Sequence, residues 1–380
     1  MKLTPSAGAE RLEHLDALRG FALLTVCLSN LRDFSLYSYL PAEAQAAFST
    51  ASADGIYAVL YSIFIETKGL TILTLLFGIG FAIQTRRIPL TFYARRSFGL
   101  FVIGLAHGLF WFNDILRVYA LGGLFLMLTL PIPPLSLGII GFAIAVFPWN
   151  QFQSIPSDVA GMVSSTYGAF SGHSFSEMVR ANIRYDWWLR TVEWSFPIAL
   201  LGRLILGAAI GRTSVITEPG KHLLFWRKTF RITLVVGAIL TALQLTGWEN
   251  NFGDFTGHTA HGAVSVTLGL CYLAGFVLLF QRPAWRARLR IFVPIGRMTL
   301  TNYLLQTAIA VTLFYGVGLG LGSRFGLIGL LPFCAVIFTF QLLFSNWWLE
   351  RFTFGPIEWI WRCLTYGSVI PIRKVASIKS

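Results

Sequence analysis

Long apolar stretches separated by short charged connections are the feature that most constrains this sequence. Only 12% of its residues are charged and 55% are hydrophobic, whereas an ordinary soluble domain carries about 25% charged residues. A helix needs about 20 mostly apolar residues to cross the hydrocarbon core of a bilayer. The sequence therefore predicts an all-α polytopic membrane helix bundle that forms a single integral membrane domain over residues 1–380. About ten crossings are expected, at 15–31, 57–84, 96–113, 114–130, 134–149, 191–211, 228–247, 259–281, 291–316 and 325–349.

The distribution of basic residues predicts how these segments are oriented. Placing the amino terminus in the cytoplasm puts the arginine-rich connections at 86–96, 212–231 and 282–290 on the cytoplasmic side, together with the basic tail. The outside connections at 32–56, 248–258 and 317–324 contain few Lys and Arg, as the positive-inside rule requires. We therefore expect both termini in the cytoplasm. The net charge of +13 is spread over short loops, so it indicates anionic lipid headgroups as partners and not nucleic acid.

Three further features bear on how the chain is organised. The longest extracytoplasmic connection, 150–190, contains Trp187 and Trp188 and predicts an interfacial helix that covers a site from outside. The amino terminus has no apolar core followed by a cleavage site, so no removable signal peptide is expected. The four cysteines show no CxxC spacing and lie in or beside apolar runs, which is typical of buried thiols.

Ionisable residues inside apolar segments mark candidate functional positions. Each costs about 2.5 to 3.5 kcal/mol near the bilayer centre, so it usually faces a polar interior. Asp16 and Arg19 lie three residues apart in the first segment and can pair across one helical turn. Asn30 follows on nearly the same helix face, about three turns further along. Either this face lines a passage, or the pair simply lies at the cytoplasmic membrane surface.

The most suggestive spacing places His107, Trp111 and Asp114 on one face of a continuous helix. If the helix breaks at Asn113, Asp114 instead begins the next helix, where free backbone amides favour a carboxylate. In both cases a histidine with a nearby carboxylate can exchange a proton near neutral pH. The alternative is a histidine that only hydrogen-bonds a neighbouring helix.

Other polar residues give weaker signals. Lys68 precedes an apolar run and is expected to bind an anionic group, to pair with Asp114, or to extend to the outer surface. Asn302, Tyr303 and Gln306 form a predicted polar stripe in the ninth segment. Arg297 lies one turn nearer the cytoplasm, where it suits a phosphate or a lipid headgroup.

Motifs for other chemistries are weak or missing. Asp254, His258 and His261 have a spacing that can hold a divalent metal, but the surrounding glycines and the lack of HExxH favour a solvated loop, so no metal is expected. The sequence contains no GxGxxG, GxxxxGK[ST] or GxSxG. Nucleotide-driven transport and hydrolase chemistry therefore lose support.

Five motifs together resemble the YeiB-like family of bacterial inner-membrane proteins, a domain of unknown function whose members are often regarded as predicted acyltransferases. They are RLEHLDALRGFALLTVCLSN, LLFGIGF after Lys68, GLAHGLFWFNDILRVYALGG, GRMTLTNYLLQT and FGPIEWIWR. The first motif is also similar to the first helix of the acyltransferase type-three membrane proteins and of lysosomal heparan-glucosaminide N-acetyltransferase. At the position of Asn30 the type-three proteins carry a catalytic histidine, whereas the lysosomal enzyme carries asparagine.

The resemblance implies acyl transfer from a cytoplasmic acyl-CoA, with acetyl-CoA as the expected donor, to an extracytoplasmic glycan or lipid. Arg19, Arg96, Arg297, Asn302 and Tyr303 are then the candidate donor-binding residues. The implied catalytic residues are His107 as base, Asp114 as its orienting partner, and Asn30 or Lys68 as the group that steadies the oxyanion.

Two other classes of function fit the same residues. A transporter or flippase for a lipid-linked or small anionic molecule would use the polar face as a permeation path, without covalent chemistry. A non-catalytic membrane partner or sensor would bind no thioester. The sequence leaves the acceptor and a homo-oligomeric state open.

Overall fold

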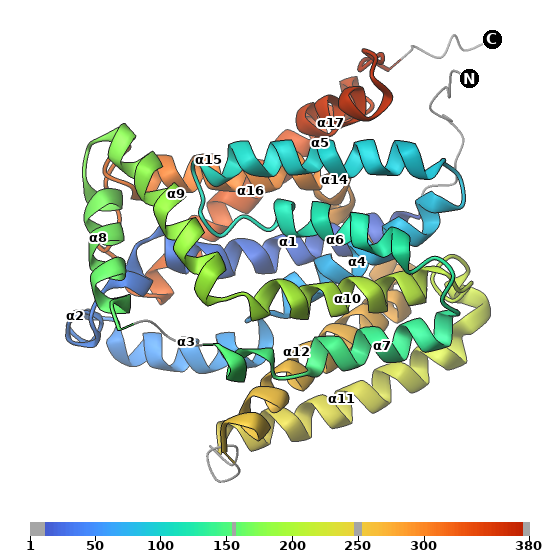
Figure 1. Cartoon of the computed structure of the whole chain (residues 1–380), viewed down its shortest axis with the longest axis horizontal. Coiled ribbons are helices and arrows are strands. Elements are labelled where there is room, and N and C mark those ends of the chain that lie inside the picture. The colour runs from blue at the N-terminus through green and yellow to red at the C-terminus, as the bar shows by residue number, and fades with distance from the viewer. Residues whose placement is uncertain (1–11, 154–156, 247–252, 375–380) are drawn as a thin grey trace.

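The computed structural model describes residues 12–153, 157–246 and 253–374, and these form an all-helical bundle (Figure 1). Within them, β pairing is limited to one isolated bridge between Phe352 and Arg373. The α-helices are α1 (Glu13–Phe34), α2 (Ala42–Ala46), α3 (Ala51–Phe64), α4 (Lys68–Thr85), α5 (Leu90–Gly108), α6 (Leu116–Leu128), α7 (Pro134–Val146), α8 (Val159–Ser171), α9 (Phe175–Val192), α10 (Ser195–Gly211), α11 (Leu223–Leu245), α12 (Gly253–Phe280), α13 (Pro283–Leu289), α14 (Val293–Arg297), α15 (Thr299–Phe314), α16 (Leu331–Arg351) and α17 (Pro356–Tyr366). Short 3₁₀ turns are η1 (Tyr37–Tyr39), η2 (Trp149–Phe152), η3 (Pro219–His222), η5 (Arg290–Phe292) and η6 (Ile328–Leu330).

The length and hydropathy of these helices support a membrane protein. Among the described residues, four helical segments are long and apolar enough to cross a bilayer, and a fifth is added if α9 and α10, which meet at 75°, form one span. Helices α6, α7 and α15 are apolar but shorter. Ten crossings with both termini in the cytoplasm therefore stay a prediction. The four segments are Ala51–Thr85, Pro219–Leu245, His261–Phe280 and Ile328–Arg351.

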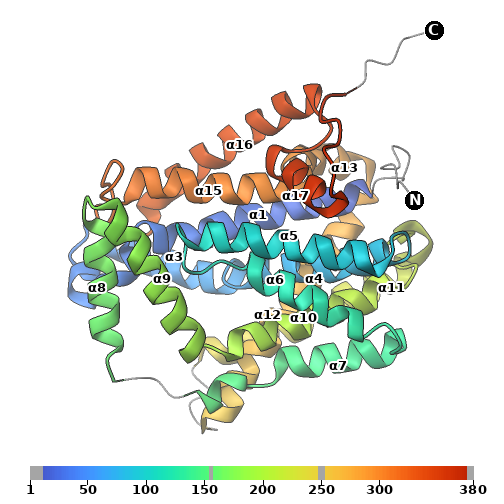
Figure 2. The same cartoon turned by 45° about the horizontal axis from the view of Figure 1, so that its top comes forward.

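The arginine-rich connections gather at one end of the bundle. Glu13 at the start of α1 forms ion pairs of 3.0 and 2.8 Å with Arg286 and Arg290. Arg86, which follows α4, donates a hydrogen bond to the carbonyl of Arg212, which follows α10. Figures 1 and 2 place α17 near this end and α8 and α9 at the opposite end. Arginine-rich connections that are far apart in the sequence therefore lie together at one end of the folded bundle.

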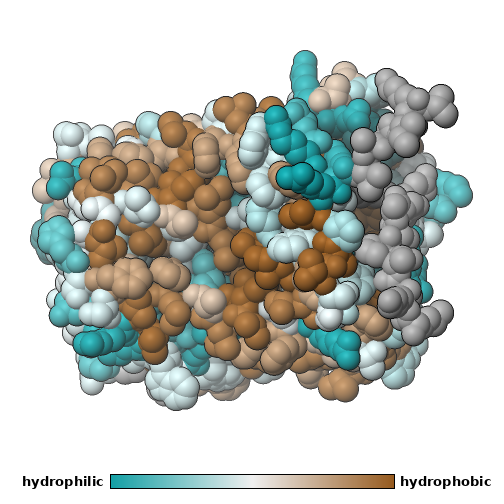
Figure 3. Space-filling model, turned by 90° about the horizontal axis from the view of Figure 1, so that it is seen from above, coloured by the Kyte–Doolittle hydropathy of each residue, from teal (hydrophilic) through white to brown (hydrophobic). Residues whose placement is uncertain are grey.

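The hydropathy of the surface also fits a membrane protein. Figure 3 shows apolar side chains gathered over the middle of one face, with hydrophilic side chains mainly toward the two ends. Many large apolar residues are exposed, including Leu128, Leu135 and Val336 at 72%, 79% and 69%. A soluble monomer rarely exposes so many together, whereas lipid tails cover such a surface without cost.

Two of the predicted membrane segments are each divided into two helices, and a third ends early. Segment 57–84 divides into α3 and α4 next to Thr67, whose φ is 61°. Segment 291–316 divides into α14 and α15 at Met298. Segment 96–113 ends as a helix at Gly108, and α6 starts only at Leu116. Each break frees backbone amides, so polar side chains are needed nearby.

Close contact between α1 and α14 positions the arginine-rich end of the bundle. A side chain on Gly296 would clash with the carbonyl oxygen of Asp16, and one on Gly20 would clash with the carbonyl of Phe292. Small residues allow two helix backbones to touch in this way. The contact places Arg297 beside the pair of Asp16 and Arg19.

We expect Gly296→Ala to destabilise the protein, because its new methyl group would push against the backbone of α1. Overpacking of this kind typically costs about 1 to 3 kcal/mol. The thermal unfolding midpoint of purified protein in detergent should therefore fall. Gly161→Ala on α8 is the matched control, since a side chain there meets nothing within 4 Å. An equal midpoint for the two variants would contradict the close contact.

Candidate active-site cavity and buried histidine

A cavity of about 290 Å³ opens in the arginine-rich part of the bundle. Side chains from α1, α4, α5, α6, α15 and α17 line it, so no single segment of sequence forms it. Four arginines line it, namely Arg19, Arg96, Arg297 and Arg362. Its apolar wall includes Phe77 and Leu100 among other side chains.

The two acids that line the cavity are already engaged. Asp16 accepts a 2.7 Å charge-assisted hydrogen bond from Arg19, which confirms the predicted pairing across one turn. Glu358 accepts hydrogen bonds from the backbone amides of Leu300 and Thr301, at 2.7 and 3.0 Å, and so caps the start of α15. Burial raises the pKa of the Glu358 carboxyl above its usual range. Cationic groups therefore outnumber anionic ones, and the cavity favours an anionic ligand.

Arg96 is held by an aromatic ring on α17. Its guanidinium carbon lies 3.5 Å from the ring centroid of Trp361, and the Trp361 indole donates a 2.6 Å hydrogen bond to the carbonyl of Arg96. A guanidinium stacked in this way keeps its donor edges available for planar anions.

His107 forms the centre of a buried hydrogen-bonded group. It is only 4% exposed; its Nδ1 lies 2.8 Å from Asp114 Oδ1, and its Nε2 lies 2.8 Å from Thr307 Oγ1. If Asp114 is ionised, Nδ1–H donates to that carboxylate, which leaves Nε2 to accept the Thr307 hydroxyl proton. A carboxylate, an imidazole and a hydroxyl in this order form the arrangement that activates hydroxyl groups in acyl-transfer sites.

The helix break places Asp114 in this group. Of the two alternatives from the sequence, the structure has the broken helix: Asp114 lies just before α6, and its Oδ2 accepts a 3.1 Å hydrogen bond from the amide of Arg117. The same carboxylate contacts the Arg117 guanidinium at 3.3 Å. Asp114 thus orients His107 and stabilises the first turn of α6 together.

Tyr303 separates the cavity from His107. Its side chain lines the cavity, and its ring centroid lies 5.0 Å from that of His107. Tyr303 and Thr307 are one turn apart on α15 and both face this histidine. Of the predicted site residues, Arg19, Arg96, Arg297 and Tyr303 therefore line one cavity, and His107 and Asp114 lie directly behind its wall.

The structure places the other predicted site residues elsewhere. Lys68 is buried at the start of α4, and its ammonium donates a hydrogen bond to the carbonyl of Ser62 and not to Asp114. Asn302 is fully buried and donates to Ser345 Oγ at 2.9 Å. Asn30 lies half-buried in the far part of α1. None of these three lines the cavity.

The residues of the predicted polar stripe on α15 do not all face the cavity. Gln306 donates to Gln341 Oε1 at 3.0 Å, and Gln341 donates to the carbonyl of Asn302 at 2.6 Å. These amides join α15 to α16, whereas Tyr303 faces the cavity. Hydrogen bonding between helices is a common role for amide side chains in membranes.

Helix α9 supplies charged residues that sequence reasoning missed. Asp186 accepts two 2.8 Å hydrogen bonds from Arg117 and one of 3.0 Å from Arg190. Arg190 also donates to the carbonyl of Asp114 at 3.1 Å. Helix α9 therefore packs over the Asp114 loop, whereas the interfacial and extracytoplasmic position of the 150–190 connection stays a prediction. The available signal was the four-residue spacing of Asp186 and Arg190, which marks a paired helix face.

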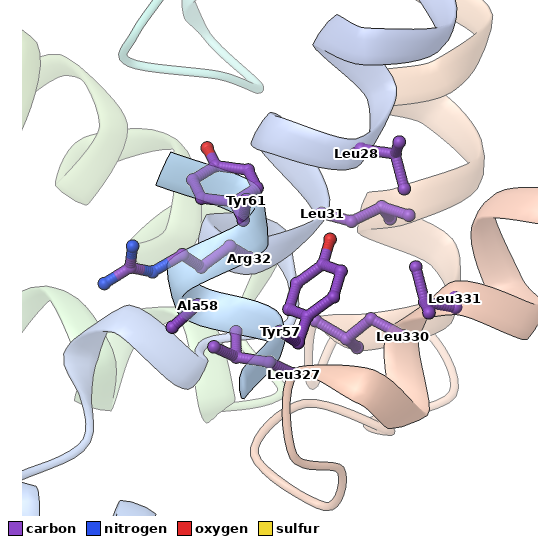
Figure 4. Close-up of a pocket in the computed structure, with 9 residues that line it drawn as sticks. All are labelled: Leu28, Leu31, Arg32, Tyr57, Ala58, Tyr61, Leu327, Leu330 and Leu331. Carbon is purple, nitrogen blue, oxygen red and sulfur yellow. The ribbon is translucent and has the colours of Figure 1, made fainter. Parts of the chain in front are cut away.

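A second pocket, shown in Figure 4, lies between α1, α3 and the start of α16. Its volume is about 20 Å³, which is room for about one water molecule. In Figure 4 the Arg32 guanidinium points away from Leu330 and Leu331. The size and the orientation of Arg32 make this pocket a poor candidate for a substrate site.

The predicted weak metal-binding spacing can be compared with the structure only in part. The side chains of Asp254 and His258 lie outside the described residues, and His261 contacts Gln244 at 2.7 Å. Among the residues described, no group of three potential metal ligands is found.

Cys27, Cys271 and Cys334 are buried thiols, as predicted, and Cys363 is partly buried; all four are free.

We expect Asp186→Ala to loosen α9, because Arg117 and Arg190 would lose their shared carboxylate. Both arginines keep their contacts with Asp114, but the charge-assisted hydrogen bonds to Asp186 are lost, and such a bond contributes about 1.5 to 3 kcal/mol. Limited proteolysis within 157–192 and the unfolding midpoint are the measurements. Glu177→Ala removes an exposed acid from the same helix and is the control. Equal protease sensitivity in both variants would show that Asp186 does not hold α9 in place.

Comparison with known proteins identifies relatives over nearly the whole chain. The chain is 29% identical to the uncharacterized protein YxaH of Bacillus subtilis, with 99% of each chain covered. It is 27% identical to the uncharacterized protein YeiB of Escherichia coli, covering 95% of this chain and 98% of that protein. An uncharacterized 39.9 kDa protein from the amylase 3′ region of Bacillus acidopullulyticus is 28% identical, with 97% and 98% covered.

A family model described as a protein of unknown function, DUF418, matches residues 210–368. This region runs from the end of α10 to α17 and contributes Arg297, Tyr303 and Arg362 to the cavity. No solved structure matches the chain. The chain is therefore similar to YxaH and YeiB over nearly its whole length, and its residues 210–368 match the DUF418 model.

Proposed function

We propose that this protein is a transmembrane acyltransferase. It would move an acyl group, with acetyl-CoA as the expected donor, from the cytoplasm to a hydroxyl or amine of an extracytoplasmic glycan or lipid. One observation carries the proposal: Tyr303 lines an arginine-bordered cavity, and its ring lies 5.0 Å from that of His107, which is paired with Asp114 and Thr307. Donor binding and proton transfer thus have adjoining places in one bundle.

The cavity supports the donor half of the reaction. The phosphates of an acyl-CoA need cations, and Arg19, Arg96, Arg297 and Arg362 supply them around the cavity. An extended acyl-pantetheine chain needs a narrow apolar passage, and side chains such as Phe77 and Leu100 provide such a wall. With the amino terminus in the cytoplasm of a bacterium, this end of the bundle would open toward the cytoplasmic donor.

His107 supports the chemical half. Its Nε2 contacts the Thr307 hydroxyl, so the acceptor hydroxyl or amine would first replace that contact. Nε2 would then take the acceptor proton while the acceptor atom attacks the thioester carbonyl. Collapse of the tetrahedral intermediate would release the thiolate, which takes the proton back from His107. Asp114 would hold the imidazole in the required tautomer and stabilise its charged form. Neither Asn30 nor Lys68 lines the cavity, so the proposed reaction does not rely on them.

Substrate would reach His107 by a rotation of Tyr303. Tyr303 and Ile115 both line the cavity, and the Tyr303 ring lies 5.0 Å from that of the histidine. Excluding water until the donor is bound protects a thioester from hydrolysis. On the other side, α9 covers the Asp114 loop and would regulate access of the acceptor.

We expect His107→Ala to reduce acetyl transfer by about 100-fold or more, the usual loss when a general base is removed. Purified protein is incubated with labelled acetyl-CoA and a panel of hexosamines and phospholipids, and thiol release is measured. His173→Ala is the control, because His173 is exposed, hydrogen-bonds the carbonyl of Gly316 and does not line the cavity. Full activity of His107→Ala would remove this histidine from the mechanism. Binding of acetyl-CoA to the wild type without thioester consumption would favour the transporter.

Donor binding gives a separate prediction for Arg96 and its neighbour Arg95 on α5. Arg96 lines the cavity, whereas Arg95 is exposed and outside its lining. We expect Arg96→Gln to weaken acetyl-CoA binding about tenfold, since a charge-assisted hydrogen bond contributes about 1.5 to 3 kcal/mol. Arg95→Gln should bind as the wild type does. Isothermal titration with acetyl-CoA measures both, and equal affinities would place the donor elsewhere.

A further inference from the structure

A groove outside the proposed active site combines cationic and apolar side chains. It lies between α11 and α12, at the arginine-rich end of the bundle, and has a volume of about 430 Å³. Three arginines border it: Arg227 and Arg231 on α11, and Arg282 just after α12. No carboxylate is part of its lining.

The three arginines have no acidic partner among the described residues. The ion pairs near this end join Asp16 to Arg19, Glu218 to Lys221, and Glu13 to Arg286 and Arg290. All three groove arginines are exposed. Arg227 and Arg231 are four residues apart, so they extend from the same face of α11. Three converging positive charges therefore remain available for an anion.

The floor of the groove is apolar and open. It is formed by Phe230, Gly275, Leu278 and Leu279. A side chain on Gly275 would approach the Phe230 ring to 3.0 Å, so glycine keeps this floor deep. Helix α11 is the outermost of the long apolar helices: only 6% of its membrane-spanning window is buried. The floor is thus continuous with a helix surface that lipid tails would cover.

We propose that this groove binds an anionic phospholipid of the surrounding leaflet. The phosphate would lie among Arg227, Arg231 and Arg282, and an acyl chain would lie along Phe230 and Leu279. Basic pockets between membrane helices at the cytoplasmic surface have the chemistry that recognises anionic headgroups. A soluble phosphate would use the arginines but gain nothing from the apolar floor. The proposal does not depend on the acyltransferase reaction.

The test measures lipid retention by the purified full chain in native mass spectrometry. Detergent-solubilised protein is titrated with dioleoylphosphatidylglycerol or dioleoylphosphatidylcholine. We expect the phosphatidylglycerol to bind at clearly lower concentration. The variant with Arg227→Gln, Arg231→Gln and Arg282→Gln should lose this preference, with affinity falling about tenfold or more, because each basic residue near an anionic headgroup contributes.

Two further variants separate the groove from general charge. The control carries Arg87→Gln, Arg95→Gln and Arg288→Gln, which remove the same charge from exposed positions at the same end; it should bind phosphatidylglycerol as the wild type does. Gly275→Leu keeps every arginine but fills the floor, so it should weaken binding. An equal loss in the control, wild-type affinity in Gly275→Leu, displacement by excess inorganic phosphate, or equal binding of phosphatidylcholine would each overturn the proposal.

Discussion

The carboxylate of Asp114 is the group around which this part of the bundle is arranged. It is 2% exposed in an apolar surrounding, where an unpaired charge costs several kcal/mol. Its oxygens are satisfied by His107 from α5 and by the backbone and guanidinium of Arg117 from α6. Arg117 in turn pairs with Asp186 from α9. The contacts that satisfy this one carboxylate thus join α5, α6 and α9, and they fix the orientation of His107.

Broken helices determine where the acids of this chain are used. A break inside an apolar bundle exposes backbone amides that need hydrogen-bond partners, and at two of the breaks a carboxylate supplies them. Asp114 serves the first turn of α6, and Glu358 serves the first turn of α15. Since Glu358 is occupied in this way and Asp16 is paired with Arg19, the arginines of the cavity keep a surplus of positive charge. The cavity favours an anion because the two acids that line it are already engaged, Glu358 with the backbone at the start of α15 and Asp16 with Arg19.

Much of the bundle could be predicted from sequence, and the candidate site only in part. The apolar segments, the charge asymmetry, the pair of Asp16 and Arg19 and the association of His107 with Asp114 all depend on residues close in sequence. Thr307 was missed because it lies two hundred residues from His107, and a threonine in an apolar helix carries no signal of its own. Asn302 looked like a member of the same polar stripe as Tyr303, yet it packs against α16.

The sequence by itself determined that the chain is an apolar helical bundle with its basic connections at one end, because hydropathy and charge act on each segment alone. It also determined which helices contain ionisable groups. Only the tertiary structure decided which of those groups meet: Thr307 with His107, Asp186 with Arg117, and the arginines of α1, α5 and α17 around one cavity. The reason is geometric. The spacing of residues in the sequence determines which side chains share one face of a helix. Which other helix that face contacts depends on how glycines and charged side chains pack between the helices.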